Sequence, residues 1–168
     1  LRETGKEELL RELAFERAAV DYFYTRQRRQ LGLGHAVLCA EPMVDGQPFV
    51  VALGDSIIGL QAQSEIVRRM IEVFETEQAE AVIAFETVPR EDVVHYGIAE
   101  PDEKRVSSPA GFFTLRRIVE KPSPETAPSC LAVAARYVFA PVIFKHLKQT
   151  KPGKGEEIQL TDAIQRLI

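Results

Sequence analysis

FVVALGDSII, residues 49–58, is a continuous apolar run that ends sharply at Gly54 and Asp55. A run of this kind is typical of a β-strand covered on both faces, as in parallel or mixed sheets flanked by helices. A carboxylate directly after such a strand stands where open α/β sheets place ligand and metal groups. Asp55 is therefore a candidate metal ligand, and the alternative interpretation makes it the N-cap of a following helix.

Helical and strand patterns alternate on both sides of this run. Helical periodicity predicts helices, listed by residue number, at 6–19, 35–41, 64–78, 141–149 and 158–168. Runs rich in apolar, aromatic or β-branched residues predict further strands at 21–27, 79–89, 91–106, 111–122 and 131–140. Neither an internal repeat nor an interdomain linker interrupts the pattern. The alternation indicates a single α/β domain over residues 1–168, with helices layered around a mixed, mostly parallel sheet.

The composition is that of an ordinary globular protein, with 45% hydrophobic residues, 27% charged residues and a net charge of −4. The mildly acidic balance argues against nucleic acid or a membrane surface as a partner. No apolar run approaches the ~20 residues of a membrane span. Cys39 and Cys130 lack metal-site spacing, and no signal peptide is visible, so we expect reduced thiols and a cytoplasmic location. Because the chain begins with Leu1 and its last helix has no C-cap signal, we expect it to be part of a longer protein.

Two short motifs carry candidate chemistry. GLGHAV, residues 32–37, begins like a dinucleotide-binding fingerprint, but Val37 stands where the third glycine would be. Its glycine pair predicts either a close approach to a ligand or a plain tight turn. RIVEKP, residues 117–122, ends a predicted strand with Glu120 and Lys121. These two side chains either turn together into a cleft or form a solvated pair at the strand end.

Six segments in order resemble the sugar-1-phosphate nucleotidyltransferases: RQ…LGLGHAVLCAEP, LGDSII, HYGI, RIVEKPSPETAPS, LAVAARYVF and GEEIQLTDAI. The resemblance covers most of the chain and implies the family's Rossmann-like layered fold. The wording of GLGHAVLCAEP and EIQLTDAI favours the uridylyl branch. A thymidylyl- or guanylyltransferase of the same family is an alternative. A non-catalytic nucleotide-sugar binding domain is another.

The resemblance implies binding roles for five residues. Gln27 and Gly32 match the residues that meet the nucleotide base, with the Gly32 backbone close to the ring. Gly97 matches a backbone contact to the sugar, and Glu120 matches a ligand of the sugar hydroxyls. Val133 lies in the segment that lines the sugar pocket.

The resemblance also implies an in-line displacement in which UTP and glucose-1-phosphate give UDP-glucose and pyrophosphate. Lys121 matches the cation that holds the sugar phosphate, and Asp55 and Asp162 match the two carboxylates that bind Mg²⁺. Charge neutralisation and alignment are what a reaction between two phosphate-bearing anions needs, so Lys121 and Asp55 are the expected catalytic residues. We also expect a homo-oligomer.

Two departures from the family pattern stand out. No segment of the chain matches the glycine-rich signature loop that cradles the triphosphate, so the N-terminal signature part of the fold is absent and the chain alone is expected to be inactive. Ala134 and Ala135 stand where many members have Val-Gly. The additional methyl group at position 135 predicts a narrower approach to the local backbone.

Overall fold

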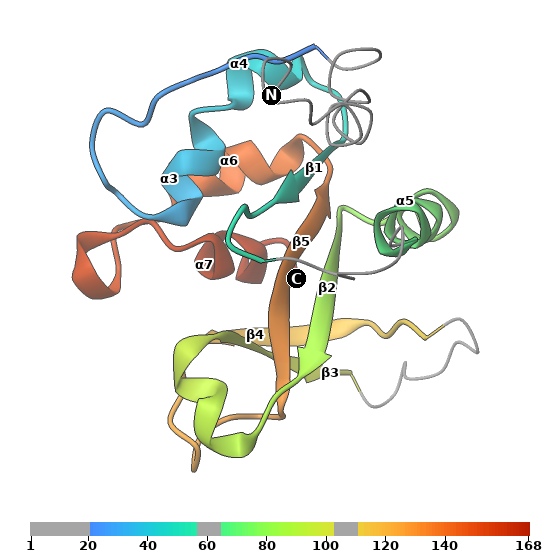
Figure 1. The fold of residues 1–168 in the computed structure, drawn as a ribbon, viewed down its shortest axis with the longest axis vertical. Coiled ribbons are helices and arrows are strands. Elements are labelled where there is room, and N and C mark those ends of the chain that lie inside the picture. Colours follow the sequence, from blue (N-terminus) through green and yellow to red (C-terminus); the bar gives the residue numbers. More distant parts are fainter. Residues whose placement is uncertain (1–20, 57–64, 103–110) are drawn as a thin grey trace, which may run out of the picture.

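The long strand β5 (Leu131–Phe139) is the centre of the sheet in the computed structural model, which describes residues 21–56, 65–102 and 111–168. β1 (Phe49–Ala52) and β2 (Ala81–Thr87) pair with opposite edges of β5, since Val138 faces Val50 on one side and Val82 on the other. β3 (Gly97–Pro101) meets β5 near its other end and also pairs with β4 (Leu115–Glu120) (Figure 1).

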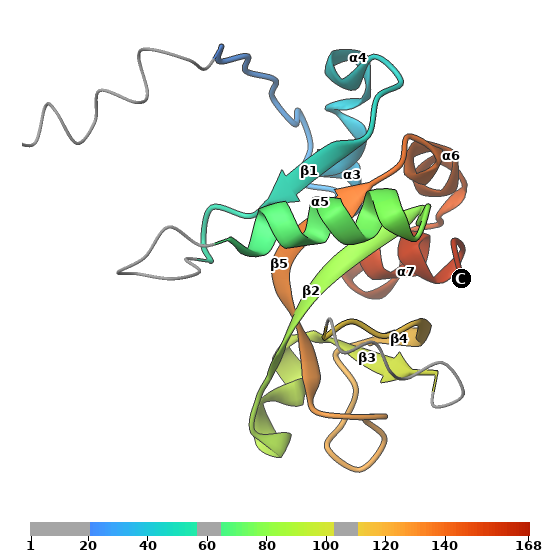
Figure 2. The same ribbon diagram turned by 90° about the vertical axis from the view of Figure 1, so that its right-hand side faces the viewer.

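Helices cover both faces of the sheet, which confirms the predicted α/β class. α5 (Ile66–Thr76) lies on one face, where Met70 packs with Ala84, Ala134 and Val138. α3 (Leu33–Leu38), α6 (Val142–Gln149) and α7 (Leu160–Gln165) lie on the other face (Figures 1 and 2). The larger core forms there, from Val37, Ile118, Tyr137, Phe139, Ile143, Phe144, Leu147, Leu160, Ala163 and Ile164.

The strand directions differ from the prediction. Every strand pairing among the described residues is antiparallel, so the expectation of a mostly parallel sheet was wrong for this part of the chain. β1 and β2 run in the same direction as each other, but β5 runs between them in the opposite direction. Apolar runs mark a strand covered on both faces. They carry no information on whether its neighbour is parallel or antiparallel.

Most predicted elements are confirmed, with shorter bounds. Residues 91–95, predicted to be extended, instead belong to a 3₁₀ helix, η2 (Arg90–His95), before β3 begins. α4 (Glu41–Val44) follows α3, and η4 (Lys154–Glu156) lies in the loop before α7. The helix predicted at 6–19 lies outside the described residues. No helix within the described ranges has the length and apolar character that crossing a bilayer requires.

The strand predicted at 21–27 is not formed. Tyr22, Phe23 and Tyr24 are 55%, 78% and 89% exposed and lie in an irregular segment. A strand needs a neighbouring strand to satisfy its backbone groups, and none of the described strands pairs with this segment. The aromatic composition signalled strand preference correctly, but preference alone does not supply a partner.

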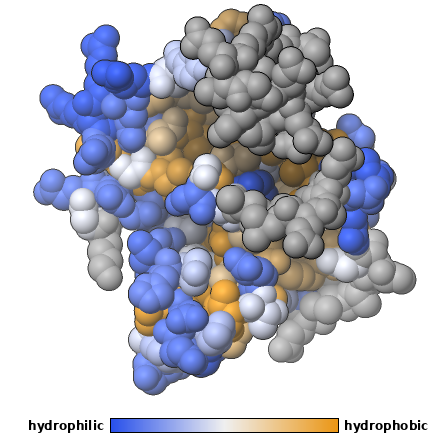
Figure 3. Space-filling model, in the orientation of Figure 1, coloured by the Kyte–Doolittle hydropathy of each residue, from blue (hydrophilic) through white to orange (hydrophobic). Residues whose placement is uncertain are grey.

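β1 is also less covered than its apolar sequence suggests. Its residues alternate between half-buried and exposed, and Val50 is 40% exposed. In the orientation of Figure 1, apolar surface lies near the middle of this face of the molecule, with hydrophilic side chains along the left margin (Figure 3). The described residues therefore leave part of the sheet's apolar surface open.

Candidate functional site

The end of the β3–β4 hairpin gathers three of the predicted sugar-binding residues. Gly97 begins β3 and Glu120 ends β4, and the antiparallel register sets them directly opposite each other. A β-carbon on Gly97 would lie 3.5 Å from Glu120 Oε2 and 3.3 Å from Val133 Cγ2. Residues from three strands, which span 36 positions of the sequence, thus come together around Gly97.

Glu120 and Lys121 form a partly exposed pair at the end of β4. Glu120 Oε2 accepts a hydrogen bond of 2.9 Å from the hydroxyl of Thr161, and Glu120 Oε1 lies 3.8 Å from Lys121 Nζ. The backbone of Lys121 has a φ of 45°, and its N–H donates to Tyr96 O at 2.9 Å. This left-handed turn ends β4 and keeps the ammonium group on the same side as the carboxylate. Of the two interpretations, the arrangement favours side chains that turn together.

Gln27 and Gly32, the predicted base-binding residues, are in direct contact. Gln27 Nε2 donates to Gly32 O at 3.1 Å and lies 2.9 Å from His35 Nδ1. A backbone carbonyl only accepts hydrogen bonds, so this contact fixes which end of the amide is the NH₂ group. The same NH₂ group can donate its second hydrogen to His35 Nδ1. Gln27 Oε1 is then left as the acceptor that the side chain presents.

The glycine pair is packed against the chain itself. Gly32 has a φ of 89°, and a β-carbon there would lie 2.7 Å from Glu157 Cβ. A β-carbon on Gly34 would lie 2.7 Å from Ile158 O, which already accepts a hydrogen bond from Gly34 N at 2.9 Å. The loop before α7 therefore explains why glycine is needed at both positions. The contact between Gly32 and a nucleotide base stays a prediction.

Asp55 lies in an exposed turn after β1 that Arg136 holds in place. The Arg136 guanidinium donates to Leu53 O at 3.1 Å and to Ser56 O at 2.7 Å, one on each side of Asp55. Ala135, the residue before Arg136, has a φ of 53°, in the left-handed region that favours glycine. The next described helix, α5, has Glu65 as its N-cap, so Asp55 does not cap that helix.

Asp162 lies in the first turn of α7 and is exposed. Its Oδ2 is 3.5 Å from the position that a β-carbon on Gly153 would take. Neither Asp55 nor Asp162 has a hydrogen-bond or ion-pair partner among the described residues. No group of three or more His, Cys, Asp and Glu side chains in those residues is placed to hold a metal. Two free carboxylates suit Mg²⁺, which binds one or two carboxylates and takes its other ligands from phosphate and water.

Tyr137 is a buried phenol whose pKa is influenced by two of the predicted site carboxylates. Its side chain is buried in β5, and that burial, followed by the negative charges of Glu120 and Asp55, raises its pKa to about 12. Both carboxylates therefore lie close enough to influence one phenol. Separately, Thr161 joins Glu120 to α7, the helix that carries Asp162.

The described contacts thus form two groups of predicted residues. One contains Gly97, Glu120, Lys121 and Val133, and the other contains Gln27 and Gly32.

Sequence reasoning missed Thr161, Arg136 and His35, which hold predicted residues in place. A charged residue inside the apolar run LAVAARYVFA was the available signal for Arg136, because a charged side chain in such a run generally needs a partner. Nothing in the sequence alone distinguished Thr161.

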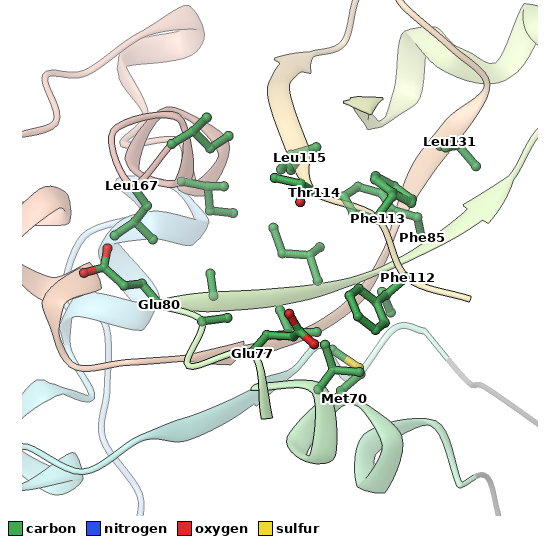
Figure 4. Close-up of a pocket in the computed structure, with 18 of the residues that line it drawn as sticks. Met70, Glu77, Glu80, Phe85, Phe112, Phe113, Thr114, Leu115, Leu131 and Leu167 are labelled. Atoms are coloured by element: carbon green, nitrogen blue, oxygen red, sulfur yellow. The ribbon is translucent and has the colours of Figure 1, made fainter. Parts of the chain in front are cut away.

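A hollow of about 950 Å³ lies elsewhere, between α5, β2, the start of β4 and the end of the chain (Figure 4). Met70, Phe85, Phe112, Phe113 and Leu167 are among the mainly apolar side chains around it. None of the described residues that line it is a predicted site residue. Charged side chains such as Glu77 and Glu80 also line the hollow. The strand ends at Gly97 and Glu120 remain the better candidate, because the predicted sugar-binding residues meet there.

Comparison with known proteins gives a family and its relatives. The model of the family "Nucleotidyl transferase" matches residues 2–168. A UTP–glucose-1-phosphate uridylyltransferase of Staphylococcus epidermidis is 39% identical over 167 residues, which are 99% of this chain and 56% of that protein. The chain therefore spans little more than half the length of this curated relative.

Solved structures give the same picture. A UDP-glucose pyrophosphorylase complexed with UDP-glucose superposes with a TM-score of 0.88 at 35% identity, over 97% of this chain and 60% of that chain. A UTP-bound UGPase from Acinetobacter baumannii has a TM-score of 0.80 at 37% identity, over 99% of this chain and 56% of that chain. Both similarities extend over nearly all of the residues in this chain.

Proposed function

The chain belongs to the nucleotidyl transferase family, and from this premise we propose that the protein makes UDP-glucose and pyrophosphate from UTP and glucose-1-phosphate. The names of its relatives support this substrate pair, since they include a UTP–glucose-1-phosphate uridylyltransferase and structures that contain UDP-glucose or UTP. The convergence of Gly97, Glu120, Lys121 and Val133 is the observation that carries the proposal.

The sugar phosphate binds at the strand ends. Glu120 accepts hydrogen bonds from sugar hydroxyls, and Lys121 neutralises the sugar phosphate. Gly97 contacts the sugar ring through its backbone, and Val133 forms an apolar wall. An ammonium group beside a carboxylate can bind both parts of a sugar phosphate: the ammonium group binds the charged phosphate, and the carboxylate binds the neutral hydroxyls.

The uracil base binds at Gln27 and Gly32. Gln27 Nε2 is occupied by Gly32 O and His35, so Gln27 Oε1 is the atom available to accept a hydrogen bond. The N3–H of uracil is a donor of the right kind. A cytosine ring has no hydrogen at this position, so a fixed Gln27 amide would favour uracil over cytosine.

The chemistry is an in-line displacement. A phosphate oxygen of glucose-1-phosphate forms a bond to the α-phosphorus of UTP, while the bond from that phosphorus to the bridging oxygen breaks and pyrophosphate leaves with the electron pair. Lys121 reduces the repulsion between the two anions, and the binding groups align them. Asp55 and Asp162 would hold Mg²⁺, which supplies additional neutralisation of phosphate charge when bound. No protein nucleophile is needed.

We further propose that residues 1–168 are an incomplete part of one nucleotidyltransferase domain in a cytoplasmic homo-oligomer. The share of the relatives that the chain spans, about 56%, supports the incomplete domain. Light scattering on the complete gene product measures the oligomeric state directly.

A pyrophosphate-release assay on the complete gene product tests the proposed reaction. UTP, dTTP and GTP are each paired with glucose-1-phosphate, and UTP is also paired with galactose-1-phosphate. We expect UTP with glucose-1-phosphate to give the highest kcat/KM. A preference for dTTP or GTP would assign the protein to another branch of the family. Tight UDP-glucose binding with no turnover by any pair would favour a non-catalytic binding protein.

A further inference from the structure

Glu120 is held from one side by a helix. Its Oε2 accepts the 2.9 Å hydrogen bond from Thr161, whereas its Oε1 faces Lys121 at 3.8 Å. The Glu120 side chain is 24% exposed, and Thr161 is only 8% exposed. The two carboxylate oxygens therefore differ: one is fixed by a buried donor, and the other lies on the side of the exposed ammonium group.

Thr161 is itself fixed. It lies in the first turn of α7, between the buried residues Leu160 and Ala163. Its Cγ2 lies against Gly97, 2.8 Å from where a β-carbon would be, so the methyl group occupies the space that this glycine leaves. Gln165 Oε1 accepts a hydrogen bond of 3.0 Å from Ile118 N and so fastens the same helix to β4. The hydroxyl of Thr161 has little freedom to turn away from Glu120.

The contact is unusual for a threonine on a helix. Helical threonines commonly bond back to the carbonyl four residues earlier. Thr76 in α5 and Thr150 at the C-cap of α6 do so here, with bonds of 2.7 Å to Glu72 O and 2.8 Å to His146 O. Thr161 stands in the first turn of α7, where the carbonyl four residues earlier belongs to the preceding loop. Its hydroxyl instead reaches across to β4.

We infer that Thr161 is a positioning residue for sugar recognition, which holds Glu120 Oε2 so that Oε1 is presented to a sugar hydroxyl. This inference rests on the proposed function, because it assigns a purpose to the Glu120 site. A carboxylate with one oxygen fixed presents its second oxygen in one direction. That direction is what distinguishes sugars that differ in the orientation of a single hydroxyl.

Thr161→Val and Thr161→Ser separate the hydroxyl from the packing. Valine has the shape of threonine and keeps a methyl group against Gly97, but it cannot donate. Serine keeps the donor and loses the methyl group. The test compares the affinities for UDP-glucose, UDP-galactose and UDP by calorimetry on the complete gene product. The ratio of the UDP-glucose affinity to the UDP affinity isolates the contribution of the sugar.

We expect Thr161→Val to lower this ratio about tenfold, equivalent to roughly 1.4 kcal/mol and thus to one hydrogen bond to a charged group. It should also bring the affinities for UDP-glucose and UDP-galactose closer together. Thr161→Ser should keep the ratio within about threefold of the original protein. In steady-state kinetics, Thr161→Val should raise the KM for glucose-1-phosphate and leave the KM for UTP unchanged.

Thr150→Val is the matched control. Thr150 is as buried as Thr161, at 8% exposed, and loses a hydrogen bond of similar length, but its partner is the helix α6. A general loss of stability would affect both valine variants alike. An equal fall in the UDP-glucose to UDP ratio for the two would overturn the inference, as would an unchanged ratio in Thr161→Val. If the original protein binds UDP-glucose no better than UDP, the proposed sugar site itself fails.

Discussion

Lys121 combines an unusual backbone with an accessible charge. Its φ of 45° is in the left-handed region, and its side chain is 46% exposed beside Glu120. An ion pair this exposed contributes little to stability. The left-handed backbone of Lys121 costs free energy, and its ion pair contributes little stability in compensation. Strained residues of this kind are typical of binding sites.

We predict that Lys121→Ala weakens the use of glucose-1-phosphate while the affinity for UTP stays unchanged. Loss of one charge-assisted contact to a phosphate should cost about 1.5–3 kcal/mol, or roughly ten- to 150-fold in kcat/KM. Alanine keeps the β-carbon and therefore the same backbone restriction, so the change tests the ammonium group. Steady-state kinetics with each substrate varied in turn measure the effect.

Lys148→Ala is the control for this change, because Lys148 is exposed and pairs with Glu41 at 2.6 Å on another part of the surface. It should leave both substrates unaffected. Equal losses for UTP and for glucose-1-phosphate in Lys121→Ala would mean that this lysine belongs to a different subsite.

At the scale of helices and strands, β3 and α7 pack tightly against each other at the site. We predict that Gly97→Ala lowers the free energy of unfolding by about 1–3 kcal/mol, the usual cost of overpacking, because its β-carbon would lie 2.8 Å from Thr161 Cγ2. Adding Thr161→Ser removes this methyl group and should recover at least half of the loss. Urea denaturation of the single and double variants provides the thermodynamic cycle.

Gly54→Ala is the matched control for the contact, since no atom lies within 4 Å of a β-carbon there. Its effect on stability should be small. If the double variant is no more stable than additivity of the two single changes predicts, the contact between Gly97 and Thr161 is not the cause of the loss.

A second element-level prediction concerns the irregularity in β5. β5 departs from regular pairing with β2 between Ile83 and Phe85, and Ala135 in this part of β5 has a φ of 53°. A residue with a β-carbon costs about 1–2 kcal/mol in this region, and replacing it by glycine removes that cost. Part of the resulting gain in stability is lost again, because glycine has a greater conformational entropy in the unfolded chain. Ala135→Gly should therefore stabilise the protein by about 0.5–1 kcal/mol. Thermal unfolding measures this, with a rise in Tm of roughly 2–4 °C per kcal/mol for a domain of this size.

Ala134→Gly gives the opposite expectation. Ala134 is 9% exposed and packs in the cluster with Met70 and Val138. Glycine there removes a buried methyl group without relieving a positive φ, so Tm should fall. A fall in Tm for Ala135→Gly as well would show that the left-handed conformation is not a source of strain.

The sequence predicted the helices and strands well where a local pattern determines the structure. The amphipathic face of α5 and the apolar runs of β1, β2 and β5 were sufficient, because periodicity and burial are local signals. The direction of strand pairing and the absence of a strand at 21–27 were not predictable, because each depends on a neighbour distant in the sequence. The same holds for the site. Glu120 and Lys121 were visible as a motif, whereas Thr161 becomes relevant only when α7 packs beside β4.

At the scale of the whole molecule, the described residues leave apolar surface uncovered in three places. These are the aromatic residues at 22–24, the exposed residues of β1 and the hollow between α5 and the start of β4. Contiguous apolar surface on a soluble protein generally marks contact with another segment or chain. The chain also spans only about 56% of a curated relative. The two observations support the proposal that residues 1–168 are an incomplete part of one domain.

The final prediction follows from that proposal. We predict that the purified 168-residue chain binds UDP-glucose but releases no pyrophosphate from UTP and glucose-1-phosphate. The sugar-side residues Gly97, Glu120 and Lys121 are all in the chain, but no segment matches the glycine-rich triphosphate loop that the family resemblance leads us to expect. Loss of a preorganised phosphate clamp removes several kcal/mol of transition-state stabilisation, because fixed donors no longer meet the charge that develops on the leaving group.

A coupled pyrophosphate assay and calorimetry on the same preparation separate the two halves of this prediction. Lys121→Ala in the 168-residue chain should weaken UDP-glucose binding, which would show that the binding uses the candidate site rather than the apolar hollow. Turnover of about one per second, ordinary for an enzyme, would show that the chain needs no further phosphate clamp. Binding that persists unchanged in Lys121→Ala would instead move the sugar phosphate away from the strand ends at Gly97 and Glu120.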